Sequence, residues 1–250
     1  MNWSVKMERK RALVTGGSRG IGKAISLMLA KNGFDVIINY RGNQEAAEST
    51  KKEVEALGVN CTLLQFDIAD FERTKTTIEK EIQDNGAIDV LILNAGTTAD
   101  SLLIKMEEDQ WEKVIDVNLK SFYYITRPIV ESMFVKKWGK IVVISSTGGL
   151  TGMPGQVNYC ASKFGIIGAA KSLAVEMGRR NINVNIIAPG YIDTELISDL
   201  KEHFNELKKQ VPMRRIGTVE DIANVTEFLI SEKASYIQGQ VIAVNGGVLT

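Results

Sequence analysis

Histidine, cysteine and proline are scarce in this chain. Its 250 residues include one histidine, two cysteines and four prolines. Cys61 and Cys160 are isolated, so the sequence indicates neither a disulfide framework nor a metal site. The single histidine, His203, lies in the polar run Lys201-Glu202-His203, which is typical of a solvated helix face.

The chain also lacks a net charge, a long apolar run and a linker. Thirty basic residues balance thirty acidic ones, which argues against a nucleic-acid or membrane-surface partner. No apolar run approaches the ~18 residues that span a bilayer, and the start lacks the apolar core of a signal peptide. No Pro/Ser-rich stretch divides the chain. We therefore expect one domain over residues 1–250 in a cytoplasmic protein.

Short apolar runs alternate with helical patterns from one end of the chain to the other. Continuous apolar strands separated by helices are typical of a parallel sheet that is covered on both faces. We expect an α/β protein with a single-domain Rossmann fold, a doubly wound parallel sheet of about seven strands. The expected strands are near 12–14, 36–38, 62–64, 90–93, 141–144, 184–187 and 241–244, and the helices near 20–32, 43–57, 70–84, 107–136, 156–179, 195–210 and 218–231.

A glycine-rich loop follows the first expected strand and leads into a helix. It reads Gly16-Gly17-Ser18-Arg19-Gly20-Ile21-Gly22, with the spacing Gly-x3-Gly-x-Gly. Glycines let the backbone turn sharply and approach a pyrophosphate, which binds at the positive N-terminus of a helix. In an alternating α/β chain this loop predicts dinucleotide binding.

The same loop is also compatible with a hydrolase. Gly16-x-Ser18-x-Gly20 matches the nucleophile elbow of α/β-hydrolases, and His203 follows it in the order that their triad requires. An elbow normally lies well into the sheet, however, and this one follows the first strand. We consider this alternative much weaker than dinucleotide binding.

The end of the second strand bears on the choice of cofactor. NAD-binding folds usually place an acid there for the ribose 2′-hydroxyl. This chain instead reads Asn39-Tyr40-Arg41, and Asp35 lies at the wrong end of the strand. The missing acid, together with Arg19 and Arg41, favours a 2′-phosphate and therefore NADP(H), although either arginine could also be an ordinary surface residue.

A tyrosine and a lysine stand four residues apart after the fifth strand. On a helix Tyr159 and Lys163 share one face. An ammonium nearby favours the phenolate, so we expect Lys163 to lower the pKa of Tyr159 and make it a proton donor for a carbonyl oxygen. Ser146, at the strand end, would supply a second hydrogen bond to that oxygen. Taken alone, such a pair is more often part of a solvated helix face.

These motifs together resemble the short-chain dehydrogenase/reductase family. The similarity covers essentially the whole chain and includes the glycine loop, Asn94-Ala95-Gly96, Asn118, Ser146, Tyr159-x3-Lys163 and Pro189-Gly190. It implies a catalytic tetrad of Asn118, Ser146, Tyr159 and Lys163, with Lys163 also on the nicotinamide ribose and Asn118 holding a water. The cofactor residues that it implies are Gly16, Ser18, Arg19, Gly20, Ile21, Gly22, Asn39, Tyr40, Arg41, Asp67, Ile68, Asn94, Ala95, Gly96, Tyr159, Lys163, Pro189, Gly190, Ile192 and Thr194.

Within that family, two groups of enzymes share further segments with the chain. The segments 98–106 and 212–217 look most like those of bacterial 3-oxoacyl-[acyl-carrier-protein] reductases of fatty acid biosynthesis, while 126–128 and 138–141 are similar to acetoacetyl-CoA reductases. We rank the first group higher. An alcohol or ketone dehydrogenase of another kind remains an alternative.

The resemblance also implies a lid, an assembly and a docking surface. Residues 191–212 would form a lid over the substrate, and the helices near 107–136 and 156–179 would form an interface of a homotetramer. Lys137 and Arg180 match basic residues that dock an acidic carrier protein near the mouth of the active site. Both also lie in runs that could be ordinary solvated charge.

Overall fold

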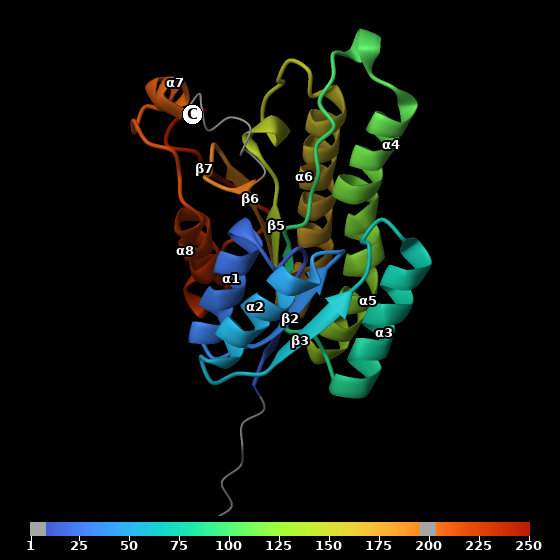
Figure 1. Cartoon of the computed structure of the whole chain (residues 1–250). Coiled ribbons are helices and arrows are strands. Elements are labelled where there is room, and N and C mark those ends of the chain that lie inside the picture. Colours follow the sequence, from blue (N-terminus) through green and yellow to red (C-terminus); the bar gives the residue numbers. More distant parts are fainter. Residues whose placement is uncertain (1–8, 196–203) are drawn as a thin grey trace, which may run out of the picture.

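The computed structural model describes residues 9–195 and 204–250, which form one parallel sheet between two layers of helices (Figure 1). The strands are β1 (Arg11–Val14), β2 (Asp35–Tyr40), β3 (Cys61–Gln65), β4 (Val90–Leu93), β5 (Gly139–Ile144), β6 (Ile182–Pro189) and β7 (Val241–Val244). The helices are α1 (Gly20–Lys31), α2 (Gln44–Glu55), α3 (Phe71–Asn85), α4 (Glu108–Ile115), α5 (Ser121–Lys136), α6 (Val157–Met177), α7 (Phe204–Gln210) and α8 (Val219–Ile230).

The strand order places the switch point of the fold between β1 and β4. The order is β3-β2-β1-β4-β5-β6-β7, and each neighbouring pair is parallel. In the register, Leu13 of β1 pairs with Ile37 of β2 on one side and with Leu91 of β4 on the other. All carboxyl ends therefore lie at one edge of the sheet, which is where ligands bind in such folds. The predicted doubly wound fold is confirmed.

The two faces of the sheet bury separate apolar cores. Along β4, Val90 and Ile92 belong to one core, whereas Leu91 and Leu93 belong to the other. The first core is closed by α1 and α8 and the second by α3, α5 and α6. Each fully buried aliphatic side chain contributes about 1.5–3 kcal/mol. The central strands are therefore a firm platform for the loops at their ends.

The expected helix over 107–136 is interrupted. Its two α-helical parts, α4 and α5, are separated by a π-helical turn, η2 (Asp116–Lys120). The hydroxyl of Ser121 donates to the carbonyl oxygen of Val117 at 2.6 Å and so satisfies a carbonyl within this turn. No helix in the described part of the chain has the length and apolar character needed to cross a bilayer.

Candidate active site

Close packing requires glycine at two positions of the loop between β1 and α1. A Cβ atom on Gly22 would stand 2.2 Å from the carbonyl oxygen of Gly16, and Gly16 itself has a φ of +60°. From the other side, the amide of Asn94 donates to the carbonyl oxygens of Thr15 at 3.0 Å and Gly16 at 3.3 Å. The loop is thus held in a turn that other residues could not form.

The helix that follows this turn begins without a side-chain cap. Arg19 is the N-cap residue of α1 and makes no capping hydrogen bond, whereas Asn43 caps α2 and Asp70 caps α3. The first turn of α1 also contains no acidic residue. Its backbone N–H groups, together with the helix dipole, suit an anionic ligand. The turn and the helix end therefore fit the pyrophosphate of a dinucleotide.

The side chain near the end of β2 is a buried amide. Asn39 Oδ1 accepts a hydrogen bond from Gly16 N at 3.4 Å, and its Nδ2 donates to Phe66 O at 3.0 Å. Asn39 thereby ties the glycine turn to the end of β3. Asp35 lies at the opposite edge, where its carboxylate accepts from Asn60 N at 2.8 Å.

Two arginines flank this end of the sheet, and each pairs with an acid. Arg41 Nη1 lies 3.6 Å from Asp67 Oδ2, and the Arg41 side chain is 71% exposed. Arg19 pairs with Glu195, which lies beyond β6. A phosphate bound here would have to compete with two carboxylates. The remaining residues predicted in this region, Tyr40 and Ile68, are buried.

Ser146 lies just after the carboxyl end of β5. Tyr159 and Lys163 lie in the first turns of α6. Lys163 Nζ lies 5.7 Å from the centre of the Tyr159 ring and donates to Ile144 O at 3.1 Å. Ser146 Oγ accepts from Gly148 N at 3.1 Å. A Cβ atom on Gly148 would stand 3.2 Å from Tyr159 Cε1. Gly148 therefore leaves room for the tyrosine ring beside the serine.

The protonation of this pair differs from the sequence-based expectation. Burial raises the pKa of Tyr159, and a hydrogen bond with Ser146 offsets this only in part. Burial also lowers the pKa of Lys163 to about 8. The pKa of Tyr159 is thus raised and not lowered as expected, because burial disfavours the charged phenolate. At neutral pH Tyr159 is a neutral hydroxyl.

Asn118 lies in the π-helical turn and is almost fully buried. Its Oδ1 accepts from Thr97 N at 2.8 Å, while its Nδ2 donates to Thr97 O at 2.9 Å and to Ser162 Oγ at 3.1 Å. A Cβ atom on Gly96 would lie 3.3 Å from Asn118 Oδ1 and 3.5 Å from Lys163 Nζ. The structure thus brings Asn118 and Lys163 together beside Gly96, next to Ala95.

The segment after β6 meets both the C-terminal strand and the glycine loop. A Cβ atom on Gly190 would be 2.8 Å from the Cα atom of Asn245, so glycine is needed after Pro189. Thr194 lies close to Gly20, where a Cβ atom would be 3.6 Å from the threonine methyl. This segment and the glycine loop therefore border the same site.

A cavity of about 330 Å³ is lined in part by residues from both ends of the predicted lid. The lid residues that line it are Tyr191, Ile192 and Val211; Met213, just after the lid, and residues 245–247, just after β7, line it as well. Its volume is at the lower end of the range for small-molecule pockets, roughly 300–1,000 Å³. Part of the predicted lid, residues 196–203, lies outside the described residues.

Two residues that the sequence analysis did not assign to the site, Thr15 and Asn158, help to hold it together. Thr15 Oγ1 accepts from Asn94 N at 2.9 Å and from Ala95 N at 3.0 Å, and so joins the ends of β1 and β4. Asn158, fully buried, donates to Ala99 O at 2.9 Å and to Gln110 O at 3.1 Å, and so fixes the start of α6 beside Tyr159. Their places at a strand end and next to the tyrosine were the signals available in the sequence.

The two predicted docking residues lie away from this edge. Lys137 precedes β5 and Arg180 precedes β6, so both lie at the amino edge of the sheet, opposite Tyr159. The Arg180 guanidinium lies 3.7 Å from the centre of the Phe134 ring. The expectation that they border the mouth is wrong within one chain, because a residue just before a strand lies at the end where that strand begins.

The hydrolase alternative gains no support. Ser18 is buried in the glycine loop, and its carbonyl accepts from Thr50 Oγ1 at 2.9 Å. His203 lies outside the described residues.

The doubly wound sheet, the glycine turn after β1 and the uncapped helix beside it define a dinucleotide-binding protein. Comparison of the sequence with known proteins shows which family within this class the chain belongs to. A family model described as "Enoyl-(Acyl carrier protein) reductase" matches residues 16–249. The chain is 44% identical over 240 residues to 3-oxoacyl-[acyl-carrier-protein] reductase FabG of Staphylococcus aureus, covering 96% of this chain and 98% of that protein.

Two further relatives carry the same name. The enzyme of Aggregatibacter actinomycetemcomitans is 45% identical over 237 residues, covering 94% of this chain and 98% of its own. That of Chlamydia muridarum is 44% identical over 241 residues, covering 96% and 97%. The chain belongs to the short-chain dehydrogenase/reductase family. It is an oxidoreductase of a family that uses a nicotinamide cofactor and acts on a hydroxyl/ketone pair.

Proposed function

We propose that this enzyme reduces 3-oxoacyl-[acyl-carrier-protein] to the 3-hydroxyacyl thioester with NADPH, as a step of fatty acid biosynthesis. The observation that carries the proposal is the identity of 44% over almost the full length of relatives with that name. The family model is named after enoyl reduction, so reduction of an enoyl thioester is compared in the test below. A neutral tyrosine beside a serine suits a substrate whose carbonyl oxygen must gain a proton.

Tyr159 and Ser146 would act on that oxygen. A nicotinamide held beside Tyr159 and Lys163 would supply the hydride for the 3-oxo carbon. As the carbonyl π bond breaks, the Tyr159 hydroxyl donates its proton to the oxygen, so the product is a neutral alcohol. Ser146 orients the oxygen with a hydrogen bond. The raised pKa of Tyr159 keeps its proton in place until charge develops on the substrate.

Lys163 and Asn118 would return a proton to Tyr159 after the reaction. The ammonium of Lys163 would bind the nicotinamide ribose and, with a pKa of about 8, lose its proton easily near neutral pH. Asn118 Oδ1 lies on the same side of Gly96 as Lys163 Nζ and would hold a water between them and solvent. Together the four residues form a proton path from solvent to the substrate oxygen.

The choice of NADPH would rest on Arg19 and Arg41. Arg41 directly follows β2 and Arg19 lies in the glycine loop, and the side chain near the end of β2 where an acid would bind the ribose is the buried amide of Asn39. A 2′-phosphate offers two negative charges to arginines that otherwise hold one exposed carboxylate each. Charge-assisted bonds of this kind are about twice as strong as neutral ones.

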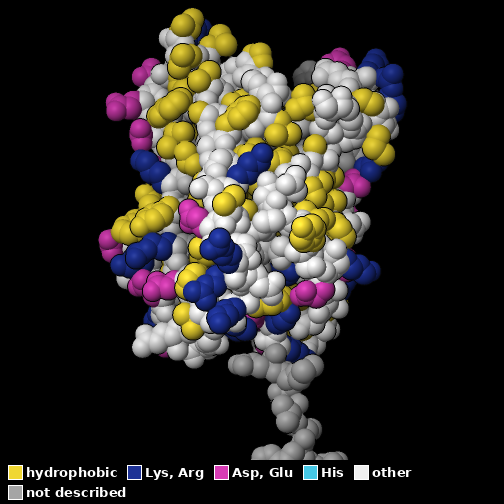
Figure 2. All heavy atoms as spheres, turned by 180° about the vertical axis from the view of Figure 1, so that it is seen from behind, with side chains coloured by type: hydrophobic (Ala, Val, Ile, Leu, Met, Phe, Trp, Pro, Cys, Tyr) yellow, Lys and Arg dark blue, Asp and Glu magenta, His cyan; other side chains and the backbone are white. Residues whose placement is uncertain are grey.

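We further propose a homotetramer in the cytoplasm. Large apolar side chains are exposed on both predicted interface helices: Tyr123, Phe134 and Val135 on α5, and Phe164 and Val175 on α6. Figure 2 shows hydrophobic side chains over the upper part of the back face and several basic side chains in its lower half. Burying such residues between subunits would remove apolar surface from water.

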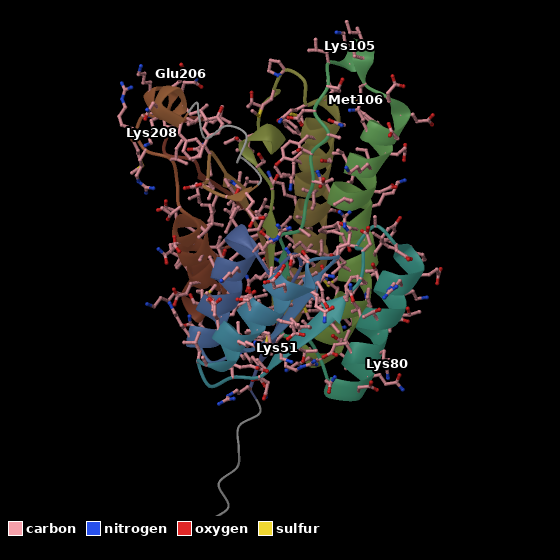
Figure 3. The ribbon with its side chains drawn as sticks, viewed as in Figure 1. Lys51, Lys80, Lys105, Met106, Glu206 and Lys208 are labelled. Carbon is pink, nitrogen blue, oxygen red and sulfur yellow. The ribbon has the colours of Figure 1, made fainter. Side chains whose placement is uncertain are left out.

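Docking of the carrier protein needs basic side chains that reach an active-site mouth. Lys137 and Arg180 could do so only in an assembly that brings them to the mouth of another subunit. Within one chain, Lys105 of η1 (Leu103–Lys105) and Lys208 of α7 lie at the carboxyl-edge end, on opposite sides (Figure 3). Both pairs are therefore proposed as docking residues and are compared below.

Initial rates of NADPH oxidation test the function. The purified enzyme is given acetoacetyl-[acyl-carrier-protein], acetoacetyl-CoA, a 2-enoyl thioester and a simple cyclic ketone, with Tyr159→Phe as the control. We expect the carrier-protein substrate to give the largest kcat/KM. A larger value with acetoacetyl-CoA would move the assignment to that substrate, and reduction of the enoyl thioester alone would contradict it.

A further inference from the structure

An acidic side chain is held beside the turn of α6 that carries the proposed proton donor. Asp100 lies in the loop between β4 and η1 and is exposed. Gln156 Nε2 donates to Asp100 Oδ2 at 2.6 Å. Gln156 is the N-cap residue of α6 and comes three residues, about one helical turn, before Tyr159. Neither Asp100 nor Gln156 has a part in the mechanism above.

The backbone on both sides of Asp100 is also joined to the start of α6. Ser101 N donates to Gly155 O at 2.8 Å, and Asn158 Nδ2 donates to Ala99 O at 2.9 Å. With the bond from the Gln156 side chain, three hydrogen bonds connect three consecutive loop residues to this one helix end. They hold the carboxylate of Asp100 at the carboxyl edge of the sheet, near the proposed proton donor.

No neighbouring base neutralises the charge of Asp100. None of the ion pairs in the described part of the chain includes it. Burial is the main cause of the raised pKa of Tyr159, and the negative charge of Asp100 raises that pKa further. Lys163 is itself buried, and its Nζ donates to Ile144 O. A negative charge therefore acts on the place where the substrate carbonyl would bind.

Such a charge separates two kinds of 3-oxo compound. A free 3-oxo acid carries a carboxylate on the second carbon from the one that is reduced, whereas a thioester is neutral at that position. Enzymes that recognise a carboxylate commonly set an arginine against it, but here the nearby charge is another carboxylate. The phosphate of a carrier-protein arm lies at the far end of the pantetheine chain, where salt screens charges more than about 8 Å apart.

We propose that Asp100 is a specificity-determining residue, which excludes 3-oxo acids with a free carboxylate and admits neutral 3-oxo esters and thioesters. Repulsion of a competitor is one of the two ways in which a protein can discriminate between ligands. Gln156 is the positioning residue that holds the Asp100 carboxylate in place. The proposal deepens the reductase function above and rests on it.

An exposed acid in a loop can also be purely structural, and removal of its charge alone separates the two roles. Asp100→Asn keeps a side-chain oxygen that can accept from Gln156 Nε2, so the loop stays joined to α6. The matched control is Asp84→Asn. Asp84 is exposed in the last turn of α3, just before β4 begins, and therefore lies at the amino edge of the sheet. Both variants remove one negative charge.

Two small substrates that differ mainly in charge test the proposal. Acetoacetate is an anion and methyl acetoacetate is its neutral ester, and each is given to the enzyme with saturating NADPH. Asp100→Asn should raise kcat/KM for acetoacetate about five- to fifteenfold, the effect of removing one of two unit charges about 10 Å apart near a protein surface. kcat/KM for methyl acetoacetate should stay within about twofold. Asp84→Asn should leave both values within about twofold.

Ionic strength gives a second measurement that a structural role would not affect. In the wild type, the ratio of kcat/KM for acetoacetate to that for methyl acetoacetate should rise with added salt, and in Asp100→Asn it should stay constant. The salt dependence of the wild type decides if the variant does not fold.

No gain on acetoacetate in a folded Asp100→Asn variant, an equal gain on both substrates, or a wild-type ratio that does not change with salt would overturn the proposal. A wild-type enzyme that reduces methyl acetoacetate but none of the thioesters would instead remove the proposed function and leave the role of Asp100 standing.

Discussion

The ammonium of Lys163 lies one helical turn from Tyr159, 5.7 Å from the centre of its ring, yet the pKa of the tyrosine is raised and that of the lysine is lowered to about 8. The two groups share a buried environment that opposes both charges. The lowered tyrosine pKa that the sequence predicts is therefore not found in this site. Its resting state at neutral pH is a neutral phenol with a weakly held ammonium proton.

Tyr159→Phe should lower kcat by 10²- to 10⁴-fold, the usual contribution of a general acid. Fluorescence titration with NADPH should show an affinity within a few-fold of wild type, because only one hydroxyl group is lost. A variant that keeps more than about a tenth of the wild-type rate would rule out Tyr159 as the proton donor.

Lys163→Met should stabilise the fold while it harms catalysis. A buried lysine with a pKa of about 8, against 10.5 when unfolded, makes the native state bind fewer protons than the unfolded state between those values. The charge therefore costs most below pH 8, about 3 kcal/mol at 1.36 kcal/mol per pKa unit, and nothing above pH 10.5. Urea unfolding should show the gain of Lys163→Met shrinking as pH rises from 8 to 10.5. A gain that does not change with pH would contradict this.

Arg41→Asp should erode or invert the preference for NADPH. The wild type should prefer NADPH to NADH by about ten- to hundredfold in kcat/KM, since charge-assisted bonds contribute about 1.5–3 kcal/mol. Glu195→Gln is the informative partner variant: it frees Arg19 from its ion pair and should lower KM for NADPH but not for NADH. Equal rates with both cofactors in the wild type would show that the two arginines do not select the phosphate.

Charge reversal should identify the docking surface. Two double variants reverse the charge at different edges of the sheet: Lys137→Glu/Arg180→Glu at the amino edge, and Lys105→Glu/Lys208→Glu at the carboxyl edge. Reversing the charge of the pair that docks the carrier protein should raise KM for 3-oxoacyl carrier protein severalfold. The increase in KM should be smaller at high salt. Turnover of a short N-acetylcysteamine thioester should not change. If neither pair affects KM, docking by these lysines and arginines is wrong.

Most of the fold was predictable because every strand is a short apolar run bounded by turns. The proposed site residues were found for the same reason: Gly16, Asn94, Ser146 and Pro189 each stand at the end of such a run, and parallel strands bring these ends to one edge. The position of Lys137 at the amino edge could have been predicted in the same way. It stands just before a strand, which places it at the opposite edge.

Two features of the site depend on contacts that local sequence does not contain. Burial of Tyr159 and Lys163 is set by packing of α6 against β5 and η3 (Thr147–Gly149), and this burial reverses the expected shift in the tyrosine pKa. The π-helical turn at Asn118 has the same apolar periodicity as an α-helix. It is defined by its tertiary partners Thr97 and Ser162.

The geometry of the proposed active site depends on the number of residues in this π-helical turn. A π-helical turn holds about one residue more than an α-helical one, and each residue advances an α-helix by about 100°. Deleting one residue among 116–120 would let α4 and α5 join as a regular helix with little relative rotation, because four α-helical residues wind through about the same angle as the five residues of this turn. The wider turn that carries Asn118 to Thr97 and Ser162 would then be lost, although both helices could keep their packing. Homologous sequences that keep the asparagine but differ in length here cannot place its amide in the same way.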